Sequence, residues 1–109
     1  MTKKEIPLRF YNTDLYQILL NQLTHFHIHP HDMEASVQRK ESKYTVILRF
    51  GEEFSHEQTK DFIDEDFIHG KENIIEFFYI SAKTFFIKKV KTFIKKYLYV
   101  YHWFNLLRL

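Results

Sequence analysis

The chain has 109 residues and a net charge of +2, and 45% of its residues are apolar, so it can form one domain with a hydrophobic core. Two glycines and two prolines are too few for the tight turns of an all-β sandwich or barrel, and because cysteine is absent the chain cannot form disulfides, a zinc ribbon or a catalytic thiol. No apolar leader opens the sequence and no uncharged run approaches the ~18 residues of a membrane span, so we expect a soluble cytoplasmic protein without a transmembrane segment.

The first half of the chain predicts a strand, a helix and a hairpin. Apolar and polar residues alternate over 6–11, which is the period of a strand with one buried face. Asn12 or Thr13 can cap a following helix with apolar residues at 3.6-residue spacing, and Pro30 prevents that helix from continuing. Alternation over 33–38 and again over 44–50, with a short polar connection between them, predicts a β-hairpin.

The next segment predicts a helix and then a strand. Ser55 followed by Gln58 is a capping-box pattern that opens a helix, and Gly70 suits the position just past its end. Residues 74–80 are dense in β-branched and aromatic side chains, which favours a strand. A cap at Asn73 would suit the start of one long helix instead, so both assignments stay open.

From residue 84 onward the apolar residues follow the period of a helix. They are spaced alternately by four and three residues, which is a heptad stripe made by Phe86, Val90, Phe93, Tyr97, Val100, Phe104 and Leu107. We expect a helix of about 24 residues, or ~36 Å. The element order then predicts an α+β fold, a ferredoxin-like βαββαβ sheet over residues 1–82 with an appended long C-terminal helix over 83–109, packed on that domain or on a partner. This element order hosts many unrelated functions.

The net charge hides two segments of opposite sign. Residues 1–76 hold nine Lys/Arg and fourteen Asp/Glu, whereas residues 77–109 hold seven Lys/Arg and no acid. Half of the acids lie between residues 52 and 66, and they are Glu52, Glu53, Glu57, Asp61, Asp64, Glu65 and Asp66. Either the two segments face each other or stay solvated, or the basic C-terminal helix seeks phosphate, an anionic lipid or an acidic partner.

A cluster of histidines is the most unusual local feature. In extended chain the imidazoles would share one face and could bind zinc together with the neighbouring carboxylate, and the residues are His25, His27, His29, His31 and Asp32. A protonation switch and an ordinary polar loop are the alternatives. Because no second cluster supplies further ligands, we predict no metal and no cofactor.

The sequence offers little to catalysis or to base stacking. Lys60 stands where a zincin motif beginning at His56 needs its second histidine, and two glycines cannot make a P-loop or a Rossmann fingerprint. An RNA-recognition module needs aromatic rings where Thr45 and Ile47 stand. We therefore expect a protein without enzymatic activity and identify no small-molecule substrate.

The C-terminal helix is the element that we expect to carry the function, because at ~36 Å it should extend beyond strands of roughly 23 Å. We expect a small regulatory or interaction protein that associates through this helix with a second copy or with another protein. The residues expected to bind the partner are Phe86, Phe93, Tyr97, Tyr101, Trp103 and Phe104. The alternative is nucleic-acid binding through Lys88, Lys89, Lys91, Lys95 and Lys96. A membrane surface and packing on the chain's own core stay open, and the composition, rich in Lys, Ile and Phe, suggests a bacterial origin.

Overall fold

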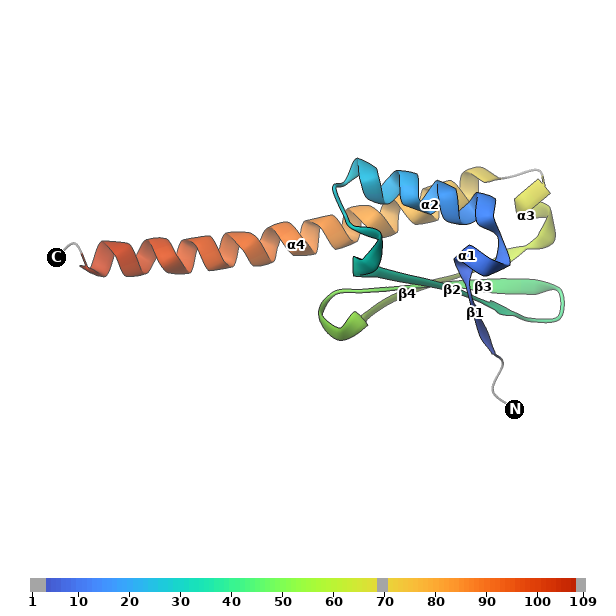
Figure 1. Ribbon diagram of the computed structural model, residues 1–109, viewed down its shortest axis with the longest axis horizontal. Helices are drawn as coiled ribbons and strands as arrows, with labels where there is room; N and C mark the ends of the chain where they lie inside the picture. Colours follow the sequence, from blue (N-terminus) through green and yellow to red (C-terminus); the bar gives the residue numbers. More distant parts are fainter. Residues whose placement is uncertain (1–3, 69–70, 108–109) are drawn as a thin grey trace.

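The computed structural model describes residues 4–68 and 71–107, and in this part of the chain four strands form one sheet. Two helices lie side by side over one face of that sheet (Figure 1). In chain order the elements are β1 (Glu5–Pro7), α1 (Leu8–Tyr11), α2 (Thr13–His25), the 3₁₀ turn η1 (Pro30–Asp32), β2 (Met33–Arg39), β3 (Lys43–Phe50), the 3₁₀ turn η2 (Glu52–Phe54), β4 (His56–Ile63), α3 (Asp64–Ile68) and α4 (Lys71–Leu107). The chain is an α+β protein with a long C-terminal helix, as predicted.

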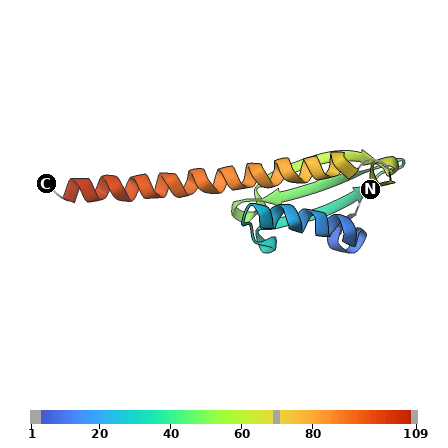
Figure 2. The same ribbon diagram turned by 90° about the horizontal axis from the view of Figure 1, so that it is seen from above.

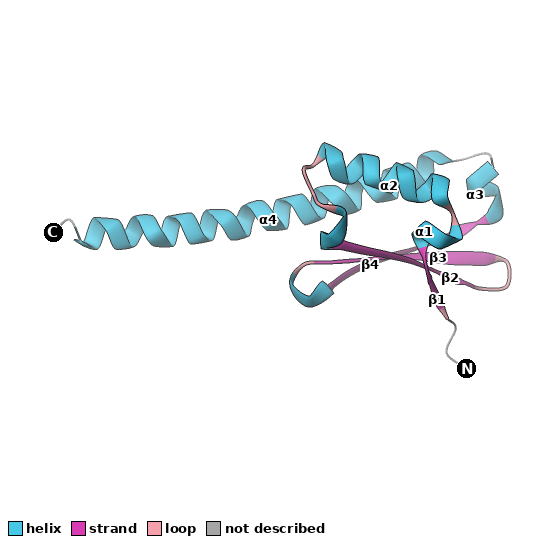
Figure 3. Cartoon of the chain, viewed as in Figure 1, coloured by secondary structure: helices cyan, strands magenta, loops and turns pink. Residues whose placement is uncertain are grey.

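Each strand of the sheet pairs antiparallel with its neighbour in sequence, in the order β1-β2-β3-β4. The predicted hairpin is confirmed, with a register that runs from Met33 opposite Phe50 to Arg39 opposite Tyr44. The predicted ferredoxin-like βαββαβ order is not confirmed, because a third antiparallel strand follows the hairpin where a helix was expected. Figure 3 shows the strands below the two long helices.

Residues 56–63, predicted as a helix, form the edge strand β4. Alternate side chains of β4 meet basic or polar side chains of β3, and the pairs include Glu57 with Arg49 at 3.0 Å and Asp61 with Lys43 at 3.2 Å. Such cross-strand pairs stabilise a strand, and they compete with the local capping-box pattern. The helix that does form begins after β4: in the first turn of α3, the Asp66 side chain accepts a hydrogen bond at 2.9 Å from the amide of Ile63, the residue before this helix.

The N-terminal strand is shorter than predicted. Pairing stops at Pro7, which has no amide hydrogen to donate, and residues 8–11 form a single helical turn instead. The side chain of Asn12 accepts a hydrogen bond from the Leu15 amide at 3.1 Å, so the predicted cap of α2 is confirmed.

Residues 74–80, for which a strand was favoured, are the first turns of α4. Their buried members recur at helical spacing, and with the next turns the buried side chains are Ile74, Phe77, Phe78, Ser81, Ala82 and Phe85. The segment was ambiguous because its exposed face is also apolar, and periodicity is weak evidence in a short run that is apolar on both faces. The predicted division between residues 82 and 83 falls inside this continuous helix.

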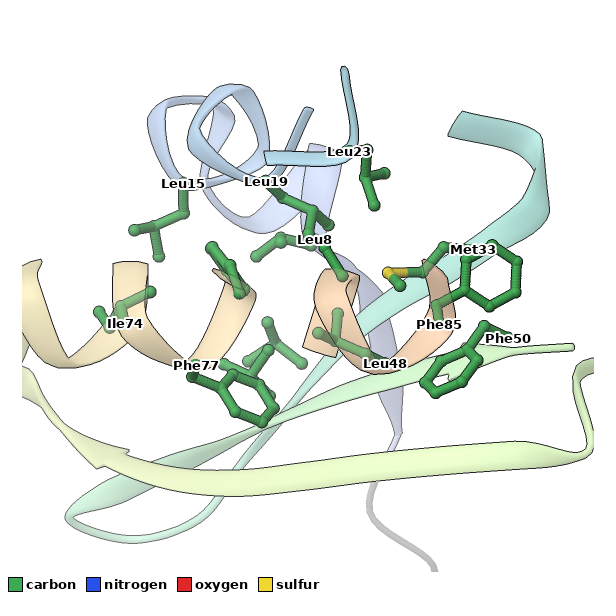
Figure 4. Close-up of a cluster of buried hydrophobic side chains, with 14 of the residues drawn as sticks. Leu8, Leu15, Leu19, Leu23, Met33, Leu48, Phe50, Ile74, Phe77 and Phe85 are labelled. Carbon is green, nitrogen blue, oxygen red and sulfur yellow. The ribbon is translucent and has the colours of Figure 1, made fainter. Parts of the chain in front are cut away.

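The hydrophobic core lies between α2, α4 and the covered face of the sheet (Figure 4). Helix α2 contributes Leu15, Leu19 and Leu23 to it, as its helical spacing predicts. The Phe50 and Phe85 rings meet edge to face with centroids 5.0 Å apart, and this contact joins the end of β3 to α4. The position and direction of α4 are therefore fixed by the core.

We predict that Ser81→Ala stabilises the protein. Ser81 is fully buried and its hydroxyl has no hydrogen-bond partner within the described part of the chain. Alanine removes this unsatisfied group and favours the helix, so the free energy of unfolding should rise by about 1 kcal/mol in urea denaturation. The matched control is Ala82→Ser, which adds a hydroxyl to the next buried position and should lower the same quantity by about 1 kcal/mol. A loss of stability in Ser81→Ala would contradict the conclusion that the Ser81 hydroxyl is buried without a hydrogen bond.

Candidate interaction surface and pocket

Helix α4 divides into two halves that differ in burial. Its first half lies on the sheet and supplies six buried side chains, the last of them Phe85. Its second half runs past the end of the sheet, and the molecule measures 66 × 31 × 18 Å as a result (Figure 2). All described side chains from Phe86 to Leu98 are exposed. The predicted overhang of the helix is therefore present in the structure.

A broad apolar stripe follows the exposed side of α4. We call it the outer stripe, and its described members are Ile75, Tyr79, Ile80, Phe86, Ile87, Val90, Phe93, Ile94, Tyr97 and Leu98. At 100° per residue these positions cover an arc of about 140°, which begins beside the buried position 82 and reaches the side opposite to the buried position 78. The stripe is bordered by Phe26, the residue that follows α2, whose ring lies 5.5 Å from the ring of Tyr79 and 5.7 Å from that of Phe86.

The residues predicted to bind a partner belong to this stripe where the structure describes them. Phe86, Phe93 and Tyr97 are 38%, 69% and 62% exposed, respectively. The side chains of Tyr101, Trp103 and Phe104 lie outside the described ones. The heptad pattern thus marks an uncovered face of α4, whereas the core uses a different face of the same helix.

The basic and acidic segments do not pair extensively with each other. Three acids of β4 and α3 are bound by basic side chains of the hairpin, as in the bidentate contact of Asp64 with Arg39 at 2.8 and 3.2 Å. In the described part of the chain the one ion pair that involves an α4 lysine joins Lys89 to Asp32 at 3.7 Å. The projecting half of α4 therefore keeps a positive charge.

The lysines predicted for nucleic-acid binding form two neighbouring rows on α4. Three of them, Lys88, Lys89 and Lys96, line a pocket on the side of α4 toward the sheet. Lys91 and Lys95 lie outside that lining, although at 100° per residue Lys95 points within about 20° of Lys88.

The pocket lies at the base of the projecting half and has a volume of about 570 Å³. Its walls come from η1, from the β3–β4 connection, from β4 and from α4. The lining residues are His31, Asp32, Phe50, Gly51, Glu52, Phe54, His56, Phe85, Lys88, Lys89, Thr92, Phe93 and Lys96. Sequence reasoning missed this site because its members are far apart in the chain.

On the face of the sheet away from the helices, charged side chains form a network with Arg49 at its centre. Arg49 contacts Glu5 at 2.7 and 2.8 Å, Glu57 at 3.0 Å and Glu34 at 3.3 Å. These hydrogen bonds hold the pKa of the Glu5 carboxyl below its usual value and raise that of the Arg49 guanidinium. The network joins one guanidinium to three carboxylates on this face.

The histidine cluster does not converge. His29 accepts a hydrogen bond at Nδ1 from the His31 amide at 3.1 Å, and the two rings stack with centroids 4.8 Å apart. His25 instead packs edge to face on Phe26. Over residues 4–68 and 71–107, no group of three His, Cys, Asp or Glu side chains could hold a metal ion.

Comparisons with protein-family models, with curated proteins and with solved structures find no match to this chain. Among the described residues, no helix combines the length and hydrophobicity needed to cross a bilayer.

We predict that the β3–β4 connection at the pocket requires its glycine. Gly51 has a φ of +86°, and a Cβ atom there would lie 2.6 Å from Cδ2 of His56. Gly51→Ala should therefore lower the free energy of unfolding by about 1–3 kcal/mol. Glu53 also has a positive φ of 54°, so Glu53→Gly relieves strain and should raise stability by about 0.5 kcal/mol. Urea denaturation measures both changes, and equal effects of the two variants would contradict the argument.

Proposed function

We propose that this protein acts by association, without catalysis, and that its α4 helix pairs with the same helix of a second copy. The observation that carries the proposal is the outer stripe, because ten large apolar side chains stay exposed along one face of a helix that projects from its own domain. Burial of such a face favours a helix partner. A small regulatory or adaptor protein would work in this way.

The positions in the stripe favour an antiparallel pair. Tyr79 and Phe93 are both seven residues from Phe86, and Ile75 and Tyr97 are both eleven residues from it. A two-fold axis at Phe86 therefore places Tyr79 opposite Phe93 and Ile75 opposite Tyr97 of the second copy. The projecting half of each helix would cover the exposed face of the domain-bound half of the other.

The charges on α4 favour the same direction. Its two acids, Glu72 and Glu76, lie near its beginning, whereas Lys88, Lys91, Lys95 and other lysines lie further along. A parallel pair would place lysines against lysines. In the antiparallel pair the acidic beginning of one helix lies beside the lysine-rich later part of the other, so opposite charges come closer together.

Nucleic-acid binding is the second candidate, and the positive charge of the projecting half supports it. Lys88, Lys91 and Lys95 are spaced by three and four residues and follow one side of α4, which suits this candidate as well. The candidate leaves the outer stripe uncovered, however, and this argues against it.

We predict that Phe93→Glu disrupts the association. A carboxylate in the middle of a buried apolar interface should weaken self-association at least tenfold, which light scattering on a sizing column and sedimentation equilibrium measure. Thr92→Glu is the matched control, because it adds the same charge on the neighbouring position but faces the pocket side, and it should leave the association within about twofold. A monomeric parent protein would contradict the proposal. Co-purified nucleic acid that dissociates at high salt would favour the second candidate.

A further inference from the structure

We propose that the pocket at the base of the projecting half of α4 binds a small phosphorylated ligand that carries a flat ring, such as a nucleotide. The inference goes beyond association, because the pocket lies on the side of α4 that faces the sheet. Its volume of about 570 Å³ falls in the range of roughly 300–1,000 Å³ that small-molecule sites occupy.

The cationic wall of the pocket consists of side chains one helical turn apart. Lys88, Thr92 and Lys96 are spaced by four residues, so they follow one side of α4. The Lys88 ammonium lies 3.3 Å from Nδ1 of His56 on β4, to which it donates a hydrogen bond. Lys96 has no ion pair within the described part of the chain. Two ammonium groups therefore border the pocket without an acid to neutralise them, and such groups bind phosphate oxygens.

The remaining charges of the lining reduce this positive potential without removing it. Lys89 is held by Asp32 at 3.7 Å and lies over the ring of Phe85, so it is not free for a ligand. Glu52 is the second acid of the lining, and within the described residues it forms no ion pair. Glu52 would repel an anion at this place, which makes it a sensitive probe of where the anion sits.

The floor and the rim of the pocket are aromatic. Phe50 and Phe85 lie at the floor and are buried, and Figure 4 shows them side by side. Phe54 on η2 and Phe93 on α4 stay 39% and 69% exposed in the lining. Phenyl rings with free edges and faces beside cations are suited to a flat ring attached to a phosphate.

The loop that carries Phe54 is held in an uncommon backbone conformation. Glu53 and Phe54 both have a φ of 54°, in the left-handed region that costs non-glycine residues roughly 1–2 kcal/mol each. Strain of this kind is often found at ligand sites, where the rest of the fold maintains it. Here it holds the Phe54 side chain at the lining of the pocket.

The test is isothermal titration calorimetry of the full chain with adenosine monophosphate, adenosine and inorganic phosphate. We expect saturable binding of adenosine monophosphate. Adenosine and phosphate should each bind at least tenfold more weakly, because adenosine lacks the phosphate group and phosphate lacks the flat ring. Lys96→Gln should weaken the nucleotide at least fivefold, whereas Lys91→Gln is the matched control and should change it less than twofold. Glu52→Gln should bind the nucleotide more tightly than the parent.

Three results would overturn the proposal. The first is no saturable binding of adenosine monophosphate. The second is an equal loss of affinity in Lys96→Gln and Lys91→Gln, because this indicates diffuse attraction of anions. The third is binding of inorganic phosphate as tight as that of the nucleotide. All substituted side chains are exposed, so the variants should fold, and their far-ultraviolet circular dichroism checks this. Sedimentation of the same samples measures association separately, so that loss of one property is distinguished from loss of the other.

Discussion

The packing of the first half of α4 against α2 and the sheet determines which side of this helix is exposed and where its second half projects. Ile74, Phe78 and Ala82 are fully buried, and Phe85 meets Phe50 at the end of β3. Because α4 is one continuous helix, these contacts also set the direction of its later described side chains. This rotation places Lys96 in the lining of the pocket and Tyr97, about 100° further around the helix, in the outer stripe.

The hairpin determines the charge that α4 presents. Arg39, Lys43 and Arg49 bind three carboxylates of β4 and α3, those of Glu57, Asp61 and Asp64. Because these carboxylates are already bound, they do not neutralise the lysines of the projecting half of α4. The same ion pairs hold β4 as a strand, so one set of contacts decides both the topology and the charge of the helix.

The sequence predicts those parts of the structure that depend on regular spacing. Helix α2, the hairpin and the heptad stripe follow from periodicity, and the stripe is the part of the candidate site that could be predicted. The strand over residues 56–63 could not be predicted in this way. A capping-box pattern is local, whereas the pairs of Glu57 and Asp61 with β3 are formed only in the folded chain. The alternation of Glu57, Thr59 and Asp61 was the available signal. The pocket was missed for the same reason, since Phe50, His56 and Lys88 meet only through tertiary packing.

The two proposed sites lie on opposite sides of one helix, and Phe93 belongs to the edge of both. Its ring lines the pocket and is also the most exposed described member of the outer stripe. The pocket joins the sheet to the projecting half, because His56 is fixed on β4 whereas Lys96 lies beyond the last buried residue of α4. A ligand that draws these groups together would reorient Phe93 at the helix pair. Linkage then requires that association change the affinity for that ligand by the same factor as the ligand changes association.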